Sequence, residues 1–138
     1  MAGIELHVPD FAPVRDFYSR LGFRTVWEQP PEGHKGYVVM ECGKNVLRFW
    51  CGNEEVYSHS YFRTFPPNTA LGKGVEIVME IENIDALYDT FKNSTHLLEP
   101  LREKPWGLRD FRLKDPFGYY LRITTPHDIK SGTKYLIP

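Results

Sequence analysis

One helical pattern occurs twice in this sequence, and the repeat limits the folds that the chain can adopt. Apolar side chains recur at helical spacing in both halves: Val14, Phe17, Tyr18 and Leu21, and then Ile84, Leu87, Tyr88 and Phe91. A constant offset of 70 residues relates the two sets. Such stripes are typical of amphipathic helices with one buried face. Because the pattern returns once, we expect two copies of one structural unit.

Strands are predicted around each helix. An alternating strand precedes each helix, with Ile4, Leu6 and Val8 buried in the first and Ile77, Met79 and Ile81 in the second. After the first helix we expect strands at 23–29, 36–42 and 45–51. After the second we expect a poorly defined strand at 96–103 and a hairpin within 105–126. Asn83 is expected to cap the second helix, because asparagine is a favoured N-cap residue.

The last hairpin shows its register in the sequence. The segment Asp115-Pro116-Phe117-Gly118 favours a type I turn that ends in a left-handed glycine. This turn pairs Lys114 with Tyr120 and Arg112 with Arg122. The apolar residues then share one face of the hairpin; they are Phe111, Leu113, Leu121 and Ile123. A two-residue turn would mix apolar and polar side chains, so the pattern itself supports this register.

These elements predict an α+β fold built from tandem βαβββ units. The units cover residues 1–51 and 74–126 of a single domain, 1–126, and the connector is 52–73. The tail, 127–138, has no predicted structure. With one helix outside each curved sheet, the two sheets would enclose a cup, which is a place for a ligand. The aromatic connector is expected to anchor to the body, or alternatively to form a lid or a subunit contact.

Composition excludes several functional classes. The formal net charge is −1, which argues against nucleic acid as the main partner. No apolar run approaches the roughly 20 residues of a membrane span, and no secretory signal is visible. Cys42 and Cys51 are poorly placed to pair with each other, and two free thiols favour a cytoplasmic location.

Strand alternation predicts which side chains line the cup. Charged and aromatic residues dominate the expected lining, which includes Glu5, His7, Arg48, Trp50, Glu76, Asp110, Arg112, Tyr120, Arg122 and Thr124. The repeat makes Gly3 equivalent to Glu76 and Arg48 equivalent to Arg122. These four positions are expected to face one another. The remaining histidines are expected at the surface; they are His34, His59, His96 and His127.

Several motifs carry a family resemblance. In order and spacing, Val8-Pro9-Asp10, Phe17-Tyr18, Leu21-Gly22-Phe23 and the turn at 115–118 resemble the vicinal-oxygen-chelate superfamily. That group includes glyoxalase I, extradiol dioxygenases, fosfomycin-resistance enzymes and bleomycin-resistance proteins. The resemblance spans residues 3–125 and implies the paired βαβββ fold.

The resemblance also implies where a metal would bind. Metal-using members place His or Glu at the four symmetric positions, which here hold Gly3, Arg48, Glu76 and Arg122. Only Glu76 could ligate, because glycine has no ligand atom and arginine stays cationic. A catalytic metal site needs about three protein ligands. We therefore expect no metal, no other cofactor and no catalytic residue.

Among the superfamily, the metal-free bleomycin-resistance proteins are the nearest likeness. The segment Glu103-Lys104-Pro105-Trp106-Gly107 resembles one of theirs, in which a tryptophan belongs to the drug-binding groove. Trp106 and Trp50 are therefore expected to stack on a flat ligand, which contributes about 0.5–1.5 kcal/mol beyond the buried area. The alternative is that these indoles are core residues, with Trp106 closing the cup mouth.

The three arginines of the predicted cup bear on the charge of the ligand. They favour a carboxylate, phosphate or phenolate, whereas bleomycin is cationic. The alternative is that Arg48 and Arg122 mainly neutralise Glu76 and Glu5.

The sequence therefore favours a metal-independent binding protein that sequesters a small aromatic or anionic molecule. We expect a cytoplasmic homodimer, with ligand contacts from Trp106, Trp50, Arg48, Arg112, Arg122, Glu76, Tyr120 and His7. A second hypothesis is a lyase, isomerase or dioxygenase with a metal held by Glu76, His7 and Glu5. A third is an interaction module that uses the aromatic connector as its contact surface.

Overall fold

The computed structural model describes residues 2–130, and the chain divides into two compact units between Leu71 and Gly72. Each unit contains one β-α-β-β-β series and one four-stranded sheet. The α+β class and the duplication are therefore confirmed. The cup between the units and their grouping into a single domain stay predictions.

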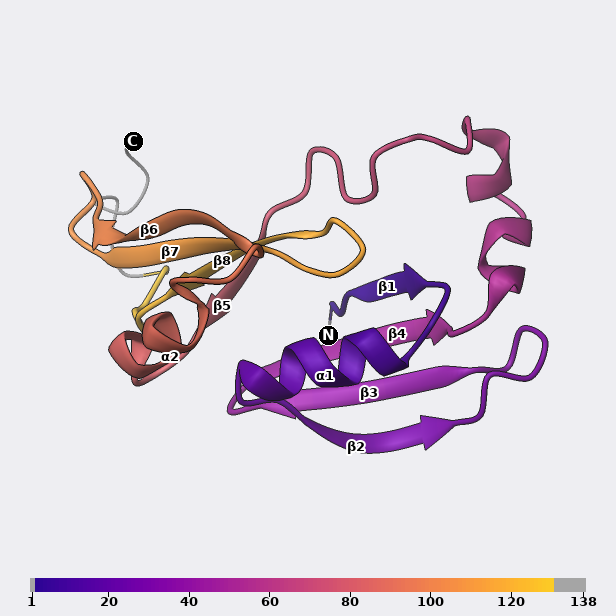
Figure 1. The fold of residues 1–138 in the computed structure, drawn as a ribbon, viewed down its shortest axis with the longest axis horizontal. Coiled ribbons are helices and arrows are strands. Elements are labelled where there is room, and N and C mark those ends of the chain that lie inside the picture. The colour runs from indigo at the N-terminus through magenta and orange to yellow at the C-terminus, as the bar shows by residue number, and fades with distance from the viewer. Residues whose placement is uncertain (1, 131–138) are drawn as a thin grey trace. The chain divides into compact units, whose positions relative to one another are not determined.

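The first unit forms a mixed sheet with strand order β1-β4-β3-β2. Its elements are β1 (Glu5–Val8), α1 (Ala12–Arg20), β2 (Arg24–Gln29), β3 (Tyr37–Cys42) and β4 (Asn45–Cys51). β1 runs parallel to β4, and the other neighbours are antiparallel. Two short 3₁₀ helices follow in the connector, η1 (Glu54–Ser58) and η2 (Phe62–Thr64). Figure 1 shows α1 lying along one face of this sheet.

The core of the first unit lies between α1 and the sheet. Val14, Phe17 and Tyr18 of α1 are fully buried, and the Tyr18 ring lies 5.2 Å from the Phe49 ring of β4. Burial of each such side chain contributes about 1.5–3 kcal/mol. Since alternate residues of a strand point to opposite faces, Arg48 and Trp50 of β4 point away from this core.

The second unit repeats this arrangement with strand order β5-β8-β7-β6. Its elements are β5 (Ile77–Glu80), α2 (Ile84–Phe91), β6 (Leu97–Glu103), β7 (Arg109–Lys114) and β8 (Tyr120–Thr124). The expected strand at 96–103 is thus a full seven-residue strand. The buried face carries Ile84 and Phe91 from the helix and the four predicted apolar residues of the last hairpin.

That hairpin has the predicted register. Lys114 pairs with Tyr120, and Arg112 pairs with Arg122. The Asp115 carboxylate accepts hydrogen bonds from the backbone N–H groups of Phe117 (2.8 Å) and Tyr119 (2.9 Å), which closes the turn. Gly118 has a φ of +97°, as the left-handed turn position requires. The alternation of apolar residues was therefore sufficient to predict this pairing.

The start of α2 differs from the prediction. Asn83 precedes the helix, but its side chain makes no capping hydrogen bond. Its backbone is left-handed instead, with a φ of 58°. Asparagine adopts this conformation more readily than most residues. The prediction of a side-chain cap was wrong, and the residue acts through its backbone.

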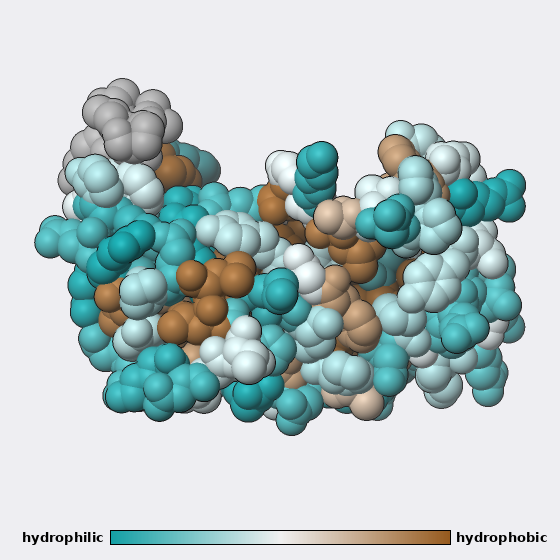
Figure 2. Space-filling view, turned by 45° about the horizontal axis from the view of Figure 1, so that its top comes forward, coloured by the Kyte–Doolittle hydropathy of each residue, from teal (hydrophilic) through white to brown (hydrophobic). Residues whose placement is uncertain are grey.

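The surface is mixed in character. Figure 2 shows apolar residues in small groups among polar ones on the face that it presents. Among residues 2–130, no helix combines the length and the apolar character needed to cross a lipid bilayer. Cys42 and Cys51 are both free thiols, as predicted, and burial raises the pKa of each.

Candidate ligand-binding site

An ion-pair network centred on Arg112 covers the sheet face of the second unit that α2 leaves open. The Arg112 guanidinium donates to Asp110 Oδ1 at 3.0 Å, to Glu76 Oε1 at 2.5 Å and to the Tyr120 hydroxyl at 2.9 Å. Burial alone would lower the pKa of Arg112, but these three acceptors raise it. Three predicted site residues therefore meet, because Glu76 and Tyr120 both bind Arg112.

Lys104 extends this network from the end of β6. Its ammonium lies 3.1 Å from Glu99 Oε1 and 3.8 Å from Asp110 Oδ1. The hydrogen bond from Lys104 is the main reason why the pKa of Glu99 is lowered. The Asp110 carboxylate, with no exposed surface, is thus held between two cations. Buried charges of this kind are stable only when paired.

Arg122 lies beside this network on β8 but takes no part in it. Within residues 2–130, no carboxylate forms an ion pair with Arg122, and its buried Nε has no hydrogen-bond partner. The alternative in which Arg122 neutralises Glu76 is therefore wrong, because Glu76 pairs with Arg112. An unsatisfied buried donor costs about 1–3 kcal/mol. On this face, the Arg122 guanidinium can therefore donate hydrogen bonds to a ligand.

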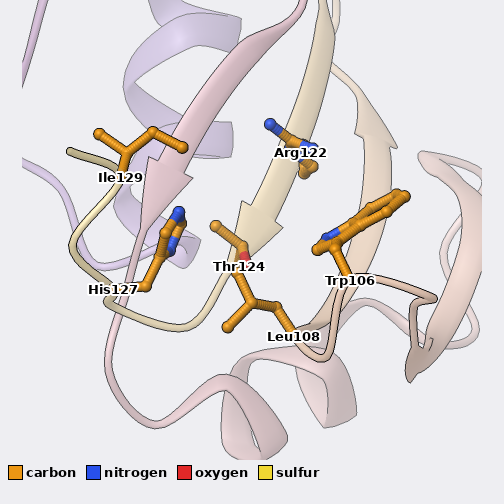
Figure 3. Close-up of a pocket in the computed structure, with 6 residues that line it drawn as sticks. All are labelled: Trp106, Leu108, Arg122, Thr124, His127 and Ile129. Atoms are coloured by element: carbon orange, nitrogen blue, oxygen red, sulfur yellow. The ribbon is translucent and has the colours of Figure 1, made fainter. Parts of the chain in front are cut away.

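A small pocket adjoins Arg122 (Figure 3). The lining side chains come from the loop after β6, from β8 and from the segment that follows β8: Trp106, Leu108, Arg122, Thr124, His127 and Ile129. Its volume of about 30 Å³ accommodates one or two groups the size of water. The loop is fixed by hydrogen bonds from Gly107 N–H to Lys104 O and from Lys104 N–H to Leu108 O, both 2.8 Å. Trp106 is therefore held at the pocket by a short hairpin.

His127 is a pocket residue that the sequence analysis placed at the surface. Only 10% of its side chain is exposed. Its backbone N–H donates to Glu80 Oε1 at 2.8 Å, and its Nδ1 lies 3.0 Å from the Thr125 carbonyl. Since a carbonyl only accepts, this Nδ1 carries a proton. The signal that could have located His127 is its position only three residues beyond β8. The rest of the predicted tail, 131–138, lies outside the described residues.

A second polar group lies on the open face of the first unit. The Tyr37 hydroxyl donates to Glu5 Oε1 at 2.6 Å, and Glu5 Oε2 lies 3.2 Å from His7 Nε2. Burial, followed by this hydrogen bond to Glu5, raises the pKa of Tyr37 to about 12. Burial also lowers the pKa of His7, and Glu5 opposes this effect. The Glu5 carboxylate therefore links the predicted site residue His7 to Tyr37.

Arg48 lies over the bare backbone of Gly3. A Cβ atom on Gly3 would be 3.1 Å from Arg48 Cζ, which is tighter than nine in ten real Cβ contacts. Within the described part of the chain, Arg48 forms no ion pair with a carboxylate; Glu5 bonds to His7 and Tyr37. The alternative in which Arg48 neutralises Glu5 is thus wrong. Among residues 2–130, neither Arg48 nor its repeat equivalent Arg122 forms an ion pair with a carboxylate.

Trp50 is surrounded by imidazoles. The His34 ring stacks on it at 5.8 Å and 7°, and the His7 ring lies 4.9 Å away. The indole N–H donates to the His34 carbonyl at 2.8 Å. His59, from the connector, packs against both Trp50 and His7. These contacts show the connector anchored to the first unit. His34 is exposed, as predicted, whereas His59 is half-buried where a surface position was expected.

The donor set of the alternative metal site does not fit a metal ion. Glu5 and His7 lie together in the first unit, but each is hydrogen-bonded, and Glu76 of the second unit is bonded to Arg112. Across residues 2–130, no group of three His, Cys, Asp or Glu side chains could hold a metal. Two ligands fall short of the roughly three that a catalytic site uses.

Comparison with solved structures shows the same fold in several bacterial proteins. A protein of unknown function from Agrobacterium tumefaciens is 21% identical over 92% of this chain and 94% of its own, with a TM-score of 0.71. The bleomycin resistance determinant of transposon Tn5 is 20% identical over 93% and 98%, with a TM-score of 0.61. A bleomycin-binding protein in complex with bleomycin is 18% identical over 92% and 98%, with a TM-score of 0.60.

Sequence comparison assigns the family. No curated protein matches the sequence. The family model described as the Glyoxalase/Bleomycin resistance protein/Dioxygenase superfamily matches residues 1–123. This match covers most of the chain and agrees with the duplicated βαβββ fold and with the structural neighbours. The chain therefore belongs to the glyoxalase/bleomycin resistance protein/dioxygenase superfamily.

Proposed function

We propose that this protein binds and sequesters a small anionic or aromatic molecule without the help of a metal. The observation that carries the proposal is the Arg122 guanidinium, which has no carboxylate partner among residues 2–130 and lies beside Trp106. A cation next to an indole attracts a ligand that has a negative group and a flat apolar part. Sequestration works by mass action and needs no catalytic group.

Charge favours an anion over a cationic drug. The bleomycin-binding protein shares the fold, and this likeness makes bleomycin one candidate ligand. However, the guanidiniums left without a carboxylate in the described faces are those of Arg48 and Arg122, and both would repel a cation. We therefore rank anionic ligands first and keep bleomycin as a comparison.

A thermal-shift screen followed by calorimetry tests the proposal. The panel contains bleomycin, aromatic and aliphatic acids, aromatic phosphates, neutral aromatics and divalent metals. A ligand at 100 times its Kd stabilises the native state by about 2.7 kcal/mol, which raises the melting temperature clearly. We expect anions to raise it and metals to leave it unchanged. Stoichiometric metal in freshly purified protein, or stabilisation by metals alone, would overturn the proposal.

We also infer a cytoplasmic homodimer. Large side chains of the connector are exposed, with 66% of Tyr57 and 60% of Tyr61 accessible in the single chain. Exposed aromatic groups of this kind often mark contact surfaces. The two free thiols support a reducing compartment. Light scattering during size-exclusion chromatography checks the dimer, because a dimer has twice the chain mass of 16.1 kDa.

A further inference from the structure

The pocket beside Arg122 has a definite chemical preference, and this inference rests on the proposed binding function. Its most specific group is the Arg122 guanidinium, which lines the pocket and forms no ion pair with a carboxylate in residues 2–130. Its Nε is buried, so the terminal nitrogens are the donors that a ligand can reach. A guanidinium binds a carboxylate through two parallel hydrogen bonds, and a planar oxyanion is therefore the group that best fits these donors.

The size of the pocket limits what enters it. A volume of about 30 Å³ is far below the roughly 300–1,000 Å³ of pockets that enclose a drug-sized ligand. One compact head group fits, and the remainder of the ligand has to lie outside. Trp106 is half-buried, so part of its indole remains accessible beside the pocket. The ligand's ring can stack on this indole while its head group reaches Arg122.

The walls distinguish between anions. Leu108 and Ile129 contribute aliphatic surface, and Ile129 is 55% exposed. In Figure 3, Trp106 and His127 lie on either side of Arg122 and Thr124. The Thr124 hydroxyl donates to the Arg109 carbonyl at 3.3 Å, so its hydrogen is already used. With a single arginine and no lysine in its lining, the pocket supplies one guanidinium charge and favours a monoanion over a phosphate dianion.

The neighbouring arginine cannot take over this role. Arg112 lies next to Arg122 in the hairpin, but Asp110, Glu76 and Tyr120 already occupy its donors. An incoming anion at Arg112 would have to displace one of these carboxylates. The single positive charge open to a ligand on this face therefore belongs, among the described residues, to Arg122.

We propose that this pocket is the head-group subsite for an aromatic monocarboxylate, with the carboxylate on Arg122, the ring on Trp106 and His127 as the opposite wall. His127 is then a ligand-contacting residue that the sequence did not reveal. The hydrogen bond between His127 Nδ1 and the Thr125 carbonyl fixes the orientation of its ring. The site thus selects for a flat ring that carries its acid group directly at one end.

Calorimetry with 2-naphthoate and 2-naphthamide on the full-length protein tests the inference. The two probes share one ring and nearly one shape, but only the first is charged. A hydrogen bond to a charged group predicts binding of naphthoate about ten- to a hundred-fold more tightly than the amide. Cyclohexanecarboxylate, which keeps the charge without the flat ring, should bind more weakly than naphthoate.

Variants assign the effect to the pocket. Arg122→Gln should remove the preference for naphthoate over the amide and leave amide binding unchanged. Arg102→Gln is the matched control, because Arg102 is an exposed arginine of the same unit outside the pocket, and it should behave as wild type. His127→Ala should weaken both probes. Circular dichroism confirms that each variant is folded.

Two results would overturn the inference. The first is equal affinity for naphthoate and the amide in the wild-type protein, a comparison that needs no variant. The second is a preference that survives Arg122→Gln. If naphthoate does not bind but another anion or bleomycin does, the head-group subsite is wrong while the proposed sequestering function stands. If nothing in either panel binds, both are wrong.

Discussion

The Arg112 guanidinium donates to the Glu76 carboxylate over 2.5 Å, and this bond determines which arginine of the second sheet is left for a ligand. Strand alternation predicts that Glu76 shares one face with Arg112 and Arg122. Because Arg112 is the arginine that binds Glu76, Arg122 keeps its charge uncompensated within the described residues. A neutralised arginine and an available one thus lie side by side in one hairpin.

Replacement of Glu76 by glutamine should destabilise the protein without abolishing ligand binding. The variant removes a charged partner from Arg112, but Asp110 and Tyr120 remain. Since 36% of the Glu76 side chain is exposed, we expect a loss of only about 1 kcal/mol in the free energy of unfolding. Urea denaturation measures this change. Glu82→Gln, at an exposed carboxylate of the same unit, is the control, and equal stabilities of the two variants would contradict the assignment.

Gly3→Ala should displace the Arg48 guanidinium. The new methyl group would be 3.1 Å from Arg48 Cζ and Nη2, so the side chain must move by a few tenths of an ångström or more. The chain fold should be unaffected, because Gly3 does not have a positive φ. A change in the Arg48 Nε–H resonance in the NMR spectrum checks this expectation. Ala2→Ser, at the neighbouring exposed position, should leave that resonance in place; an unshifted resonance in Gly3→Ala would show that Arg48 lies elsewhere.

Stability should fall in acid partly because of His7. Burial lowers the pKa of His7 below its ordinary value of 6.5, so the unfolded chain takes up a proton before the native state does. The unfolded state then binds more protons, and the free energy of unfolding decreases as the pH falls below about 6.5. We expect wild-type protein to lose more stability between pH 7.5 and 5.5 than His7→Gln, as measured by urea denaturation. Parallel losses in the two proteins would exclude His7 as the source.

The left-handed backbone of Asn83 should show in a set of variants. Asn83→Ala places an ordinary residue at a φ of 58° and should cost about 1–2 kcal/mol of stability. Asn83→Gly adopts this conformation without a steric penalty and should stay close to wild type. Asn83→Ser, which keeps a capping side chain but disfavours a positive φ, separates backbone conformation from capping. By urea denaturation it should lose stability as Asn83→Ala does, whereas a side-chain cap would keep Asn83→Ser close to wild type.

Periodicity predicted the elements of this fold well because each depends on local pattern. The face of every strand follows from alternation, which is why Arg48 and Arg122 were correctly placed away from the helices. Alternation does not specify which neighbour a long side chain reaches, since diagonal and direct neighbours both lie within range. For this reason the sequence did not specify which of the arginines binds Glu76. The positions of His127 and His59 depend on how irregular segments fold back, and they carry no periodic signal.

The three imidazoles around Trp50 give the first unit an internal optical reporter. Protonated imidazole quenches indole emission, and His7, His34 and His59 reach this indole from a strand, a loop and the connector. Its fluorescence therefore responds to any movement of the connector away from the sheet. The packing of the connector against β4 can therefore be followed through the emission of Trp50, without an added label.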